Sequence, residues 1–159
     1  MKCLTQSETE VWIREKIGED ILTMKTFGPW QLPPDAGRKM ALSKLVFANL
    51  QWDKEGILLV TDWGIWPSCE NILIFDRFRK SYGEGRSLFE APGHLIDRST
   101  VEEGEAILGL SLYFMWDVTL ISEADKLLVQ FDHHERIGLV GPDEESLQRV
   151  FQWLRNSLQ

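Results

Sequence analysis

The residues best suited to bind a metal ion lie in the segment QFDHHERIG, residues 130–138, where two of the three histidines are adjacent and flanked by acidic residues. Imidazole and carboxylate groups are common protein ligands of zinc and iron. In a strand, successive side chains point to opposite faces, so the pairs that can share an ion are Asp132 with His134, or His133 with Glu135. Each pair supplies two ligands, whereas such a site needs three or more. The sequence therefore predicts no metal site and no cofactor, with Asp132 and His134 as the residues to test for a metal.

Cys69 is the residue best placed to act as a nucleophile, because it follows Pro67 and Ser68 at the expected start of a helix. Backbone N–H groups and the helix dipole can activate a thiol in such a position. The chain has no CxxC motif, however, and the arginine of a cysteine phosphatase loop is missing after Cys69. We interpret Cys69 as a small half-buried residue, with a Cys69 nucleophile served by His94 or His133 as the alternative.

Basic and acidic residues gather in different parts of the chain. Four basic residues lie within the segment FDRFRKSYGEGR: Arg77, Arg79, Lys80 and Arg86. This basic cluster could bind a phosphate or an acidic partner, although its commoner role is a solvated helix face balanced by nearby acids. The acidic runs EEGE, at 102–105, and DEE, at 143–145, lie at expected helix starts, where the helix macrodipole already accounts for them.

The chain has seven tryptophans, and Trp52, Trp63 and Trp66 lie within fifteen residues of one another. Tryptophan is common in cores, but it also anchors interfaces, because it buries a large area and keeps one hydrogen-bond donor. Core positions are the simplest explanation for most of these residues. Trp30 lies in a proline-rich segment that we expect to be exposed, which favours a contact role for it.

Length and composition limit the classes of protein. A chain of 159 residues with 43% hydrophobic residues can bury a core without disulfides, which predicts one globular domain over residues 1–159. The net charge of −8 repels phosphate backbones, so nucleic acid is not expected as a partner. Two cysteines and an N-terminus without a secretory signal predict a cytoplasmic protein. The apolar run at 106–116 is about half the length of a membrane span, which indicates a buried helix and no membrane contact.

The elements that position these residues follow from hydrophobic periodicity and from proline and glycine. Helices are expected over 8–17, 38–50, 69–82 and 100–114 and in the C-terminal segment 141–159. Capping boxes at Ser7 with Glu10 and at Ser99 with Glu102 mark two of the helix starts.

Strands are expected over 56–66 and, as a β-hairpin, in DVTLIS and KLLVQFDH, with DHHER as the charged end of the second hairpin strand. Segment 27–37, with three prolines and two glycines, is expected to lack regular structure. Few strands among many helices predict an α+β fold. We expect a two-layer domain in which a small mixed or antiparallel sheet of three to four strands is packed by four to five helices.

Sequence motifs make an enzyme the weaker functional class. The chain contains no Walker loop, no GxGxxG turn with its acidic partner, no GxSxG and no kinase elements. The leading hypothesis is a small acidic cytosolic binding protein, of the inhibitor or immunity type, that contacts a basic protein partner. The expected contact residues are two tryptophans and three glutamates: Trp30, Trp66, Glu102, Glu103 and Glu105.

Two alternatives remain open. One is a hydrolase or transferase in which His94, His133 or His134 acts as acid or base and Asp97 or Asp132 orients it. That enzyme requires a cleft where these groups converge. The other is an oligomeric accessory protein whose tryptophans are buried in a self-interface, so a homo-oligomer is also allowed.

Overall fold

Seven strands form one antiparallel sheet in the part of the chain that the computed structural model describes, residues 1–18 and 24–158. Their order across the sheet is β1-β4-β3-β5-β6-β7-β2. The strands are β1 (Lys2–Leu4), β2 (Lys25–Gln31), β3 (Gly56–Asp62), β4 (Gly93–Ile96), β5 (Asp117–Ser122), β6 (Leu127–Asp132) and β7 (Arg136–Gly141). The α+β class is therefore confirmed, whereas the predicted three to four strands are too few.

Three of the four additional strands, β1, β2 and β4, carry a weak periodic signal. β1 and β4 have three and four residues, too few for a hydrophobic pattern to be recognised. β2 lies within the segment that was expected to lack regular structure, and that prediction is wrong over residues 27–31. An edge strand tolerates Pro29, since the ladder with β7 shifts register between Phe27 and Trp30.

The expected helices are all present, and their bounds are α1 (Gln6–Lys16), α2 (Ala36–Asn49), α3 (Ile72–Ser81), α4 (Val101–Tyr113) and α5 (Glu144–Leu158), with a 3₁₀ turn, η2 (Ser68–Asn71), before α3. The capping box of α1 is formed by Thr5 and Glu8, not by Ser7 and Glu10 as predicted. α4 begins after Thr100, and the predicted cap Ser99 instead donates its hydroxyl to Asp97.

None of the helices in the described residues is long and apolar enough to cross a membrane.

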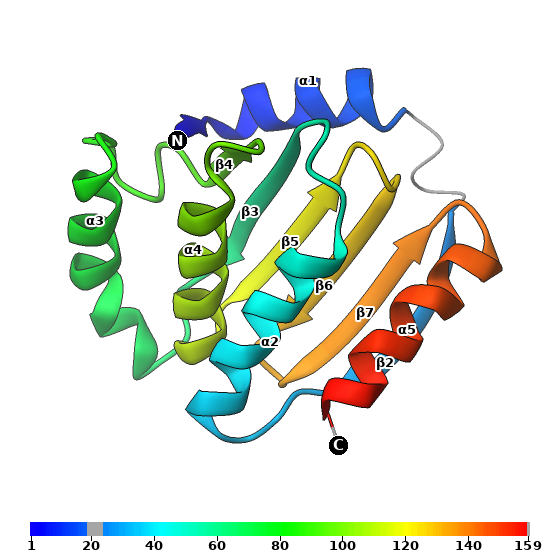
Figure 1. Cartoon of the computed structure of the whole chain (residues 1–159). Coiled ribbons are helices and arrows are strands. Elements are labelled where there is room, and N and C mark those ends of the chain that lie inside the picture. Colours follow the sequence, from blue (N-terminus) through cyan, green and yellow to red (C-terminus); the bar gives the residue numbers. More distant parts are fainter. Residues whose placement is uncertain (19–23, 159) are drawn as a thin grey trace.

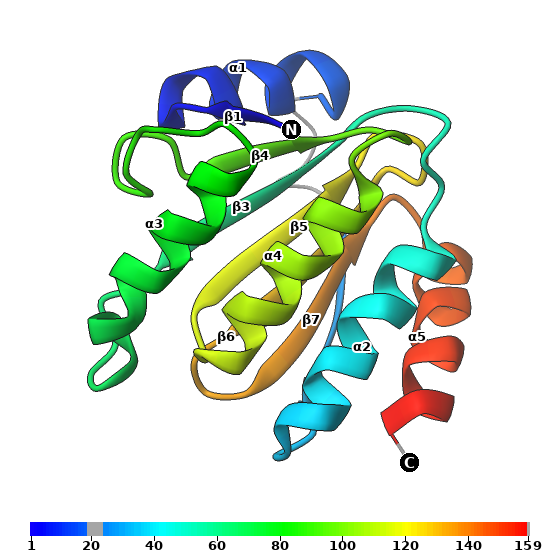
Figure 2. The same ribbon diagram turned by 60° about the vertical axis from the view of Figure 1, so that its left-hand side comes forward.

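Four helices cover one face of the sheet. Figures 1 and 2 show α2, α4 and α5 packed against this face, with α3 beside α4 over the β4 edge. Val46 of α2, Ile107 of α4 and Leu147 of α5 meet Leu58 and Leu120 of the sheet in the larger core. Alternate strand residues reach this core because side chains two apart in a strand point to the same face.

The short helix α1 covers only part of the opposite face. Its Trp12 packs against Ile57, Leu59 and Ile121 in a second, smaller core, and the Trp12 indole donates to Glu55 Oε2 at 3.1 Å. An 11-residue helix is about 16 Å long, whereas seven strands spaced about 4.8 Å apart span about 29 Å. The remainder of this sheet face therefore has no helix of the described residues above it.

Candidate functional site

The sheet face that α1 partly covers changes from apolar to polar along each of its central strands. On β3, Ile57 and Leu59 are buried under α1, and Thr61, the next residue on the same face, is exposed. On β5, Ile121 is buried, whereas Thr119 and Asp117, further from α1, are half-buried. Two neighbouring strands therefore change polarity at the same level of the sheet.

The change continues on β6 and β7. Leu128 belongs to the core under α1, and Gln130, two residues on, is exposed. We call the apolar part of this face, formed by Ile57, Leu59, Ile121 and Leu128, the covered half. We call the polar part, formed by Thr61, Asp117, Thr119, Gln130, Asp132, Arg136 and Gly138, the open half.

The open half forms a hollow of about 420 Å³ that is walled on one side by β2. Residues 26–29 of β2, next to the register shift, line this wall. Gly138 lies in the lining, opposite Gln130 on β6. A Cβ atom at Gly138 would have no heavy atom nearer than 3.7 Å, so the glycine leaves space that a side chain could occupy.

Negative charge dominates the end of this hollow. Asp117 and Asp132 line it, and Asp62 is opposite Asp117 in the ladder between β3 and β5. The one basic side chain of the open half, Arg136, is paired with Asp132 at 2.7 Å. The hollow is therefore lined by hydroxyl, amide and carboxylate groups with an excess of negative charge.

A donor cluster of Asp62, Asp117 and His133 lies at this acidic end. One ligand atom of each residue lies within 4.8 Å of those of the other two. Asp117 Oδ1 accepts the backbone N–H of His133 at 2.6 Å and lies 2.9 Å from its ring Nδ1. Asp62 Oδ1 accepts the backbone N–H of Gly64 at 2.8 Å, which orients this exposed carboxylate.

The tight turn between β6 and β7 explains why this cluster was not predicted. Residues 133–135 are a turn, with Glu135 at a φ of 59°, and not the continuation of a strand. The argument that His133 and His134 must face apart is therefore wrong, since their rings lie 4.0 Å apart. Of the residues first considered as ligands, Asp132 accepts the backbone N–H of His134, and Glu135 pairs with Lys39 at 2.6 Å.

His94 lies in a different environment, beneath α3. Its ring is fully buried, packs edge-on against Phe75, and places Nδ1 3.1 Å from the backbone oxygen of Leu58. Burial, together with the nearby charge of Arg79, lowers the pKa of His94 to about 3. Leu58 and Asp62 are four residues apart on β3, about 13 Å along a strand. His94 and His133 therefore do not meet in one cleft.

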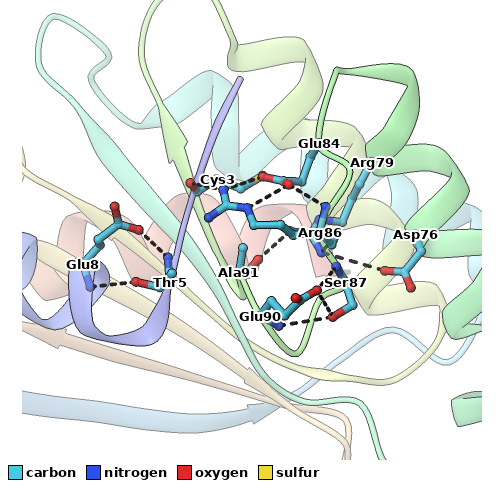
Figure 3. Close-up of polar contacts among 10 residues, drawn as sticks. All are labelled: Cys3, Thr5, Glu8, Asp76, Arg79, Glu84, Arg86, Ser87, Glu90 and Ala91. Atoms are coloured by element: carbon cyan, nitrogen blue, oxygen red, sulfur yellow. Dashed lines mark hydrogen bonds and ion pairs between the residues drawn. The ribbon is translucent and has the colours of Figure 1, made fainter.

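Two members of the basic cluster, Arg79 and Arg86, use their side chains in polar contacts within the fold, which Figure 3 shows. Arg79 is fully buried and donates to the backbone oxygen of Ala91 at 2.5 Å. Arg86 pairs with Glu84 at 2.6 Å and donates to the backbone oxygen of Cys3 at 2.9 Å. These contacts fasten the segment 83–91 to α3 and β1.

Hydrogen bonds from the Arg86 side chain lower the pKa of Glu84 to about 2. Arg77 and Lys80 are exposed on the outer side of α3. Because Arg79 is buried and the exposed Arg86 is paired with Glu84, Arg77 and Lys80 are the members of the predicted anion site that are exposed without an ion pair in the described residues.

The predicted contact residues are located on separate surfaces. Trp66 is 78% exposed in the loop after β3, whereas Trp30 is half-buried, with its ring stacked 4.5 Å from that of Phe151. Trp116, which follows the end of α4, donates to Ser68, so this end of α4 is next to the Trp66 loop.

The three glutamates of α4 are at its opposite end. Glu102, Glu103 and Glu105 lie in the first five residues of the helix, about 20 Å long. Glu102 borders a second hollow of about 590 Å³ that Trp52 and Arg98 also line. A single small contact therefore cannot use both Trp66 and these glutamates.

Cys69 lies in η2, half-buried, with its backbone N–H bonded to Ile65 O at 2.7 Å. Among the described residues, the one group of three or more His, Cys, Asp or Glu side chains that could hold a metal ion is Asp62, Asp117 and His133. Cys69 does not belong to this group.

No family model, no curated protein and no solved structure matches this chain.

Proposed function

We propose that this chain is a small acidic protein-binding domain, of the inhibitor or immunity type, and that the open half is its contact face. The partner is a protein that presents lysine or arginine side chains to the hollow of the open half, which β2 walls on one side. The change of polarity along β3, β5 and β6 is the observation that carries this proposal.

That change supports a contact surface because the same strands place apolar residues wherever α1 covers them. Thr61, Thr119 and Gln130 occupy positions that would be apolar if another element of the chain packed on them. Uncharged polar side chains on a sheet stay hydrated in the free protein and can hydrogen-bond a partner. The face is therefore suited to an external ligand larger than the hollow itself.

Charge selects the class of partner. In the described residues, Asp117 forms an ion pair with His133, and neither Asp62 nor Asp117 pairs with a lysine or an arginine. The whole chain carries a net charge of −8. Acidic surfaces accelerate encounter with basic proteins and select against acidic ones. A lysine or arginine of the partner could donate to Asp117 and to the hydroxyl groups beside it.

Trp66 extends this surface at its acidic end. It lies four residues after Asp62, in the loop that leaves β3, and 78% of it is exposed. Exposed tryptophan next to polar groups is a common anchor of protein interfaces. Trp66 is therefore retained as a contact residue, whereas Glu102, Glu103 and Glu105 belong to a separate surface that the experiment must test.

Two triple variants with the same change in net charge test the location of the contact. Thr61→Lys, Thr119→Lys and Gln130→Lys add three positive charges to the open half. Glu102→Gln, Glu103→Gln and Glu105→Gln remove three negative charges from the start of α4. Each variant raises the net charge by three, so a general charge effect would alter both equally.

The measurement is quantitative capture from a lysate of the native host, followed by the affinity of the purified partner at about 50 and about 300 mM NaCl. We expect the open-half variant to lose the partner both in the capture and in the affinity measurement. The α4 variant should retain its affinity within about threefold. Loss of binding by the α4 variant alone would move the contact to the glutamates. Unchanged binding by both variants would overturn the acidic contact.

The Asp117–His133 pair favours a second candidate, a hydrolase or transferase. A carboxylate bonded to one ring nitrogen leaves the other nitrogen of His133 to act as a general base toward a substrate in the hollow. Asp117 would then take the orienting role assigned from sequence to Asp97 or Asp132. Phosphate-ester and acyl-ester substrates test this candidate, which requires turnover by the wild type that His133→Gln abolishes and His134→Gln retains.

A further inference from the structure

We infer that Asp62, Asp117 and His133 form a binding site for a single divalent transition-metal ion, with Zn²⁺ as the best-matched species. This inference goes beyond the proposed function and does not depend on it. It rests on the donor cluster alone, which unites residues from β3, β5 and the turn after β6.

The spacing of the donors is close to what an ion requires. Ligands bonded to Zn²⁺ at 2.0–2.2 Å in a tetrahedral site lie about 3.4 Å from one another. Asp117 Oδ1 and His133 Nδ1 are 2.9 Å apart, and the three ligand atoms all lie within 4.8 Å. Asp62 is exposed, so its carboxylate can rotate inward without displacing the core.

The backbone holds two of the three ligands in place. Asp117 is fixed by the ladder between β3 and β5, and its Oδ1 accepts the backbone N–H of His133, which anchors the turn to it. Asp62 is opposite Asp117 in the same ladder. Binding therefore requires movement of side chains and little ordering of the chain, which favours a measurable affinity.

The donor set selects the class of ion. Two carboxylates and one imidazole suit Zn²⁺ and Mn²⁺, whereas Mg²⁺ and Ca²⁺ take oxygen ligands almost exclusively. Three protein ligands leave a fourth position for water or for an atom of a ligand. Asp117 belongs both to the donor cluster and to the lining of the hollow, so this fourth position is next to the open half.

Zn²⁺ titration of the EDTA-treated, dialysed chain, followed by isothermal calorimetry, tests the site. All proteins carry Cys69→Ser, so that the half-buried thiol cannot contribute a ligand. Asp62→Asn is the decisive variant because Asp62 is exposed and an asparagine oxygen can still accept the backbone N–H of Gly64, so the fold should be kept. His133→Gln is the second variant, and Asp132→Asn and His134→Gln are matched controls from the same turn.

We expect one Zn²⁺ per chain, weaker by at least about tenfold in Asp62→Asn and His133→Gln, and unchanged within about threefold in the two controls. Co²⁺ should give visible absorption bands of a four-coordinate site in the wild type, and Asp62→Asn should lose them. Absence of Zn²⁺ binding would overturn the inference. It would also be overturned by equal binding in all variants, or by loss in Asp132→Asn and His134→Gln alone.

Partner affinity distinguishes this inference from the proposed function. If Asp62→Asn loses Zn²⁺ but the partner still binds, the two sites are separate. If the partner fails to bind the wild type at all while Zn²⁺ binds, the metal site stands and the proposed function fails.

Discussion

The covered half and the open half belong to the same strands but differ in the polarity and exposure of their side chains. In the covered half, Ile57 and Ile121 are at most 2% exposed and pack against Trp12 of α1. In the open half, the equivalent positions on the same strands are Thr61 and Thr119, and no helix of residues 1–18 or 24–158 lies above them. The ladder between β5 and β6 keeps its register through both halves, and that between β3 and β5 shifts only between Val60 and Asp62. The main difference therefore lies in which residues fill the outward positions.

The outward residues therefore follow the cover above them, apolar under α1 and polar beyond it. A face destined for solvent tolerates threonine and glutamine, whereas a face under a helix requires apolar side chains. If the open half were merely unused surface, scattered charged residues would suffice. It has instead a hollow, a donor cluster and a wall formed by the irregular part of β2.

The largest effect expected from the comparison is on stability. Ile121→Ala removes a buried side chain of the covered half and should lower the free energy of unfolding by about 2–4 kcal/mol. Thr119→Val, two residues away on the same strand, keeps the branched shape and should change it by less than about 0.5 kcal/mol. Urea denaturation of both variants measures this. Equal losses would show that the open half also carries stability.

Loss of stability between pH 6.5 and 5 should arise from His94, which is buried beneath α3 and lies outside the open half. Because the folded pKa of His94 is about 3, the unfolded chain takes up this proton below about pH 6.5 and the folded chain does not. The contribution of His94 to the free energy of unfolding is fully present above pH 6.5. It falls by up to about 1.4 kcal/mol for each pH unit below 6.5, toward pH 3.

The variant His94→Gln should therefore flatten the pH dependence of unfolding between pH 6.5 and 5, while lowering stability at pH 7. Urea midpoints measured across this range provide the test, with the exposed His134→Gln as control. A slope that stays the same in His94→Gln, or one that is lost in His134→Gln, would contradict the assignment.

A smaller effect is expected when the open half is made apolar. The triple variant Thr61→Val, Thr119→Val and Gln130→Val should fold with a free energy of unfolding within about 1 kcal/mol of the wild type. An enlarged apolar patch promotes association, so the variant should self-associate at concentrations where the wild type does not. Analytical ultracentrifugation measures this, and an unchanged sedimentation coefficient would contradict the view that polarity keeps this face free.

The sequence was sufficient to predict the helices, β3 and the hairpin of β5 and β6, because each has a long periodic pattern. It was insufficient for β1 and β4, which are too short, and for β2, whose glycine and proline indicated a loop. β7 was missed because the turn at residues 133–135 was assumed to be the end of a strand. That assumption also placed His133 and His134 on opposite faces. The donor cluster was not predicted because Asp62 and Asp117 meet His133 only through the pairing of β3 with β5, which the sequence does not reveal.

The open half itself carried a recognisable signal in the sequence. In DVTLIS, Asp117 and Thr119 alternate with Val118 and Leu120, and the pattern becomes apolar on both faces at Ile121. Such a change of alternation within one strand indicates where a covering element ends. The pattern in β5 alone does not reveal a shared polar surface. That surface follows only from the register of the sheet, which places the change to polar residues on β3 and β6 at the same level as on β5.

The affinity of the captured partner for Gly138→Val tests whether the open half is the contact face. The side chain would enter the hollow of the open half, where the nearest heavy atom to a Cβ is 3.7 Å away, so the fold should keep its melting temperature. We predict that the partner binds at least about tenfold more weakly, because the side chain occupies contact space. Wild-type affinity in a correctly folded Gly138→Val protein would show that the partner binds elsewhere.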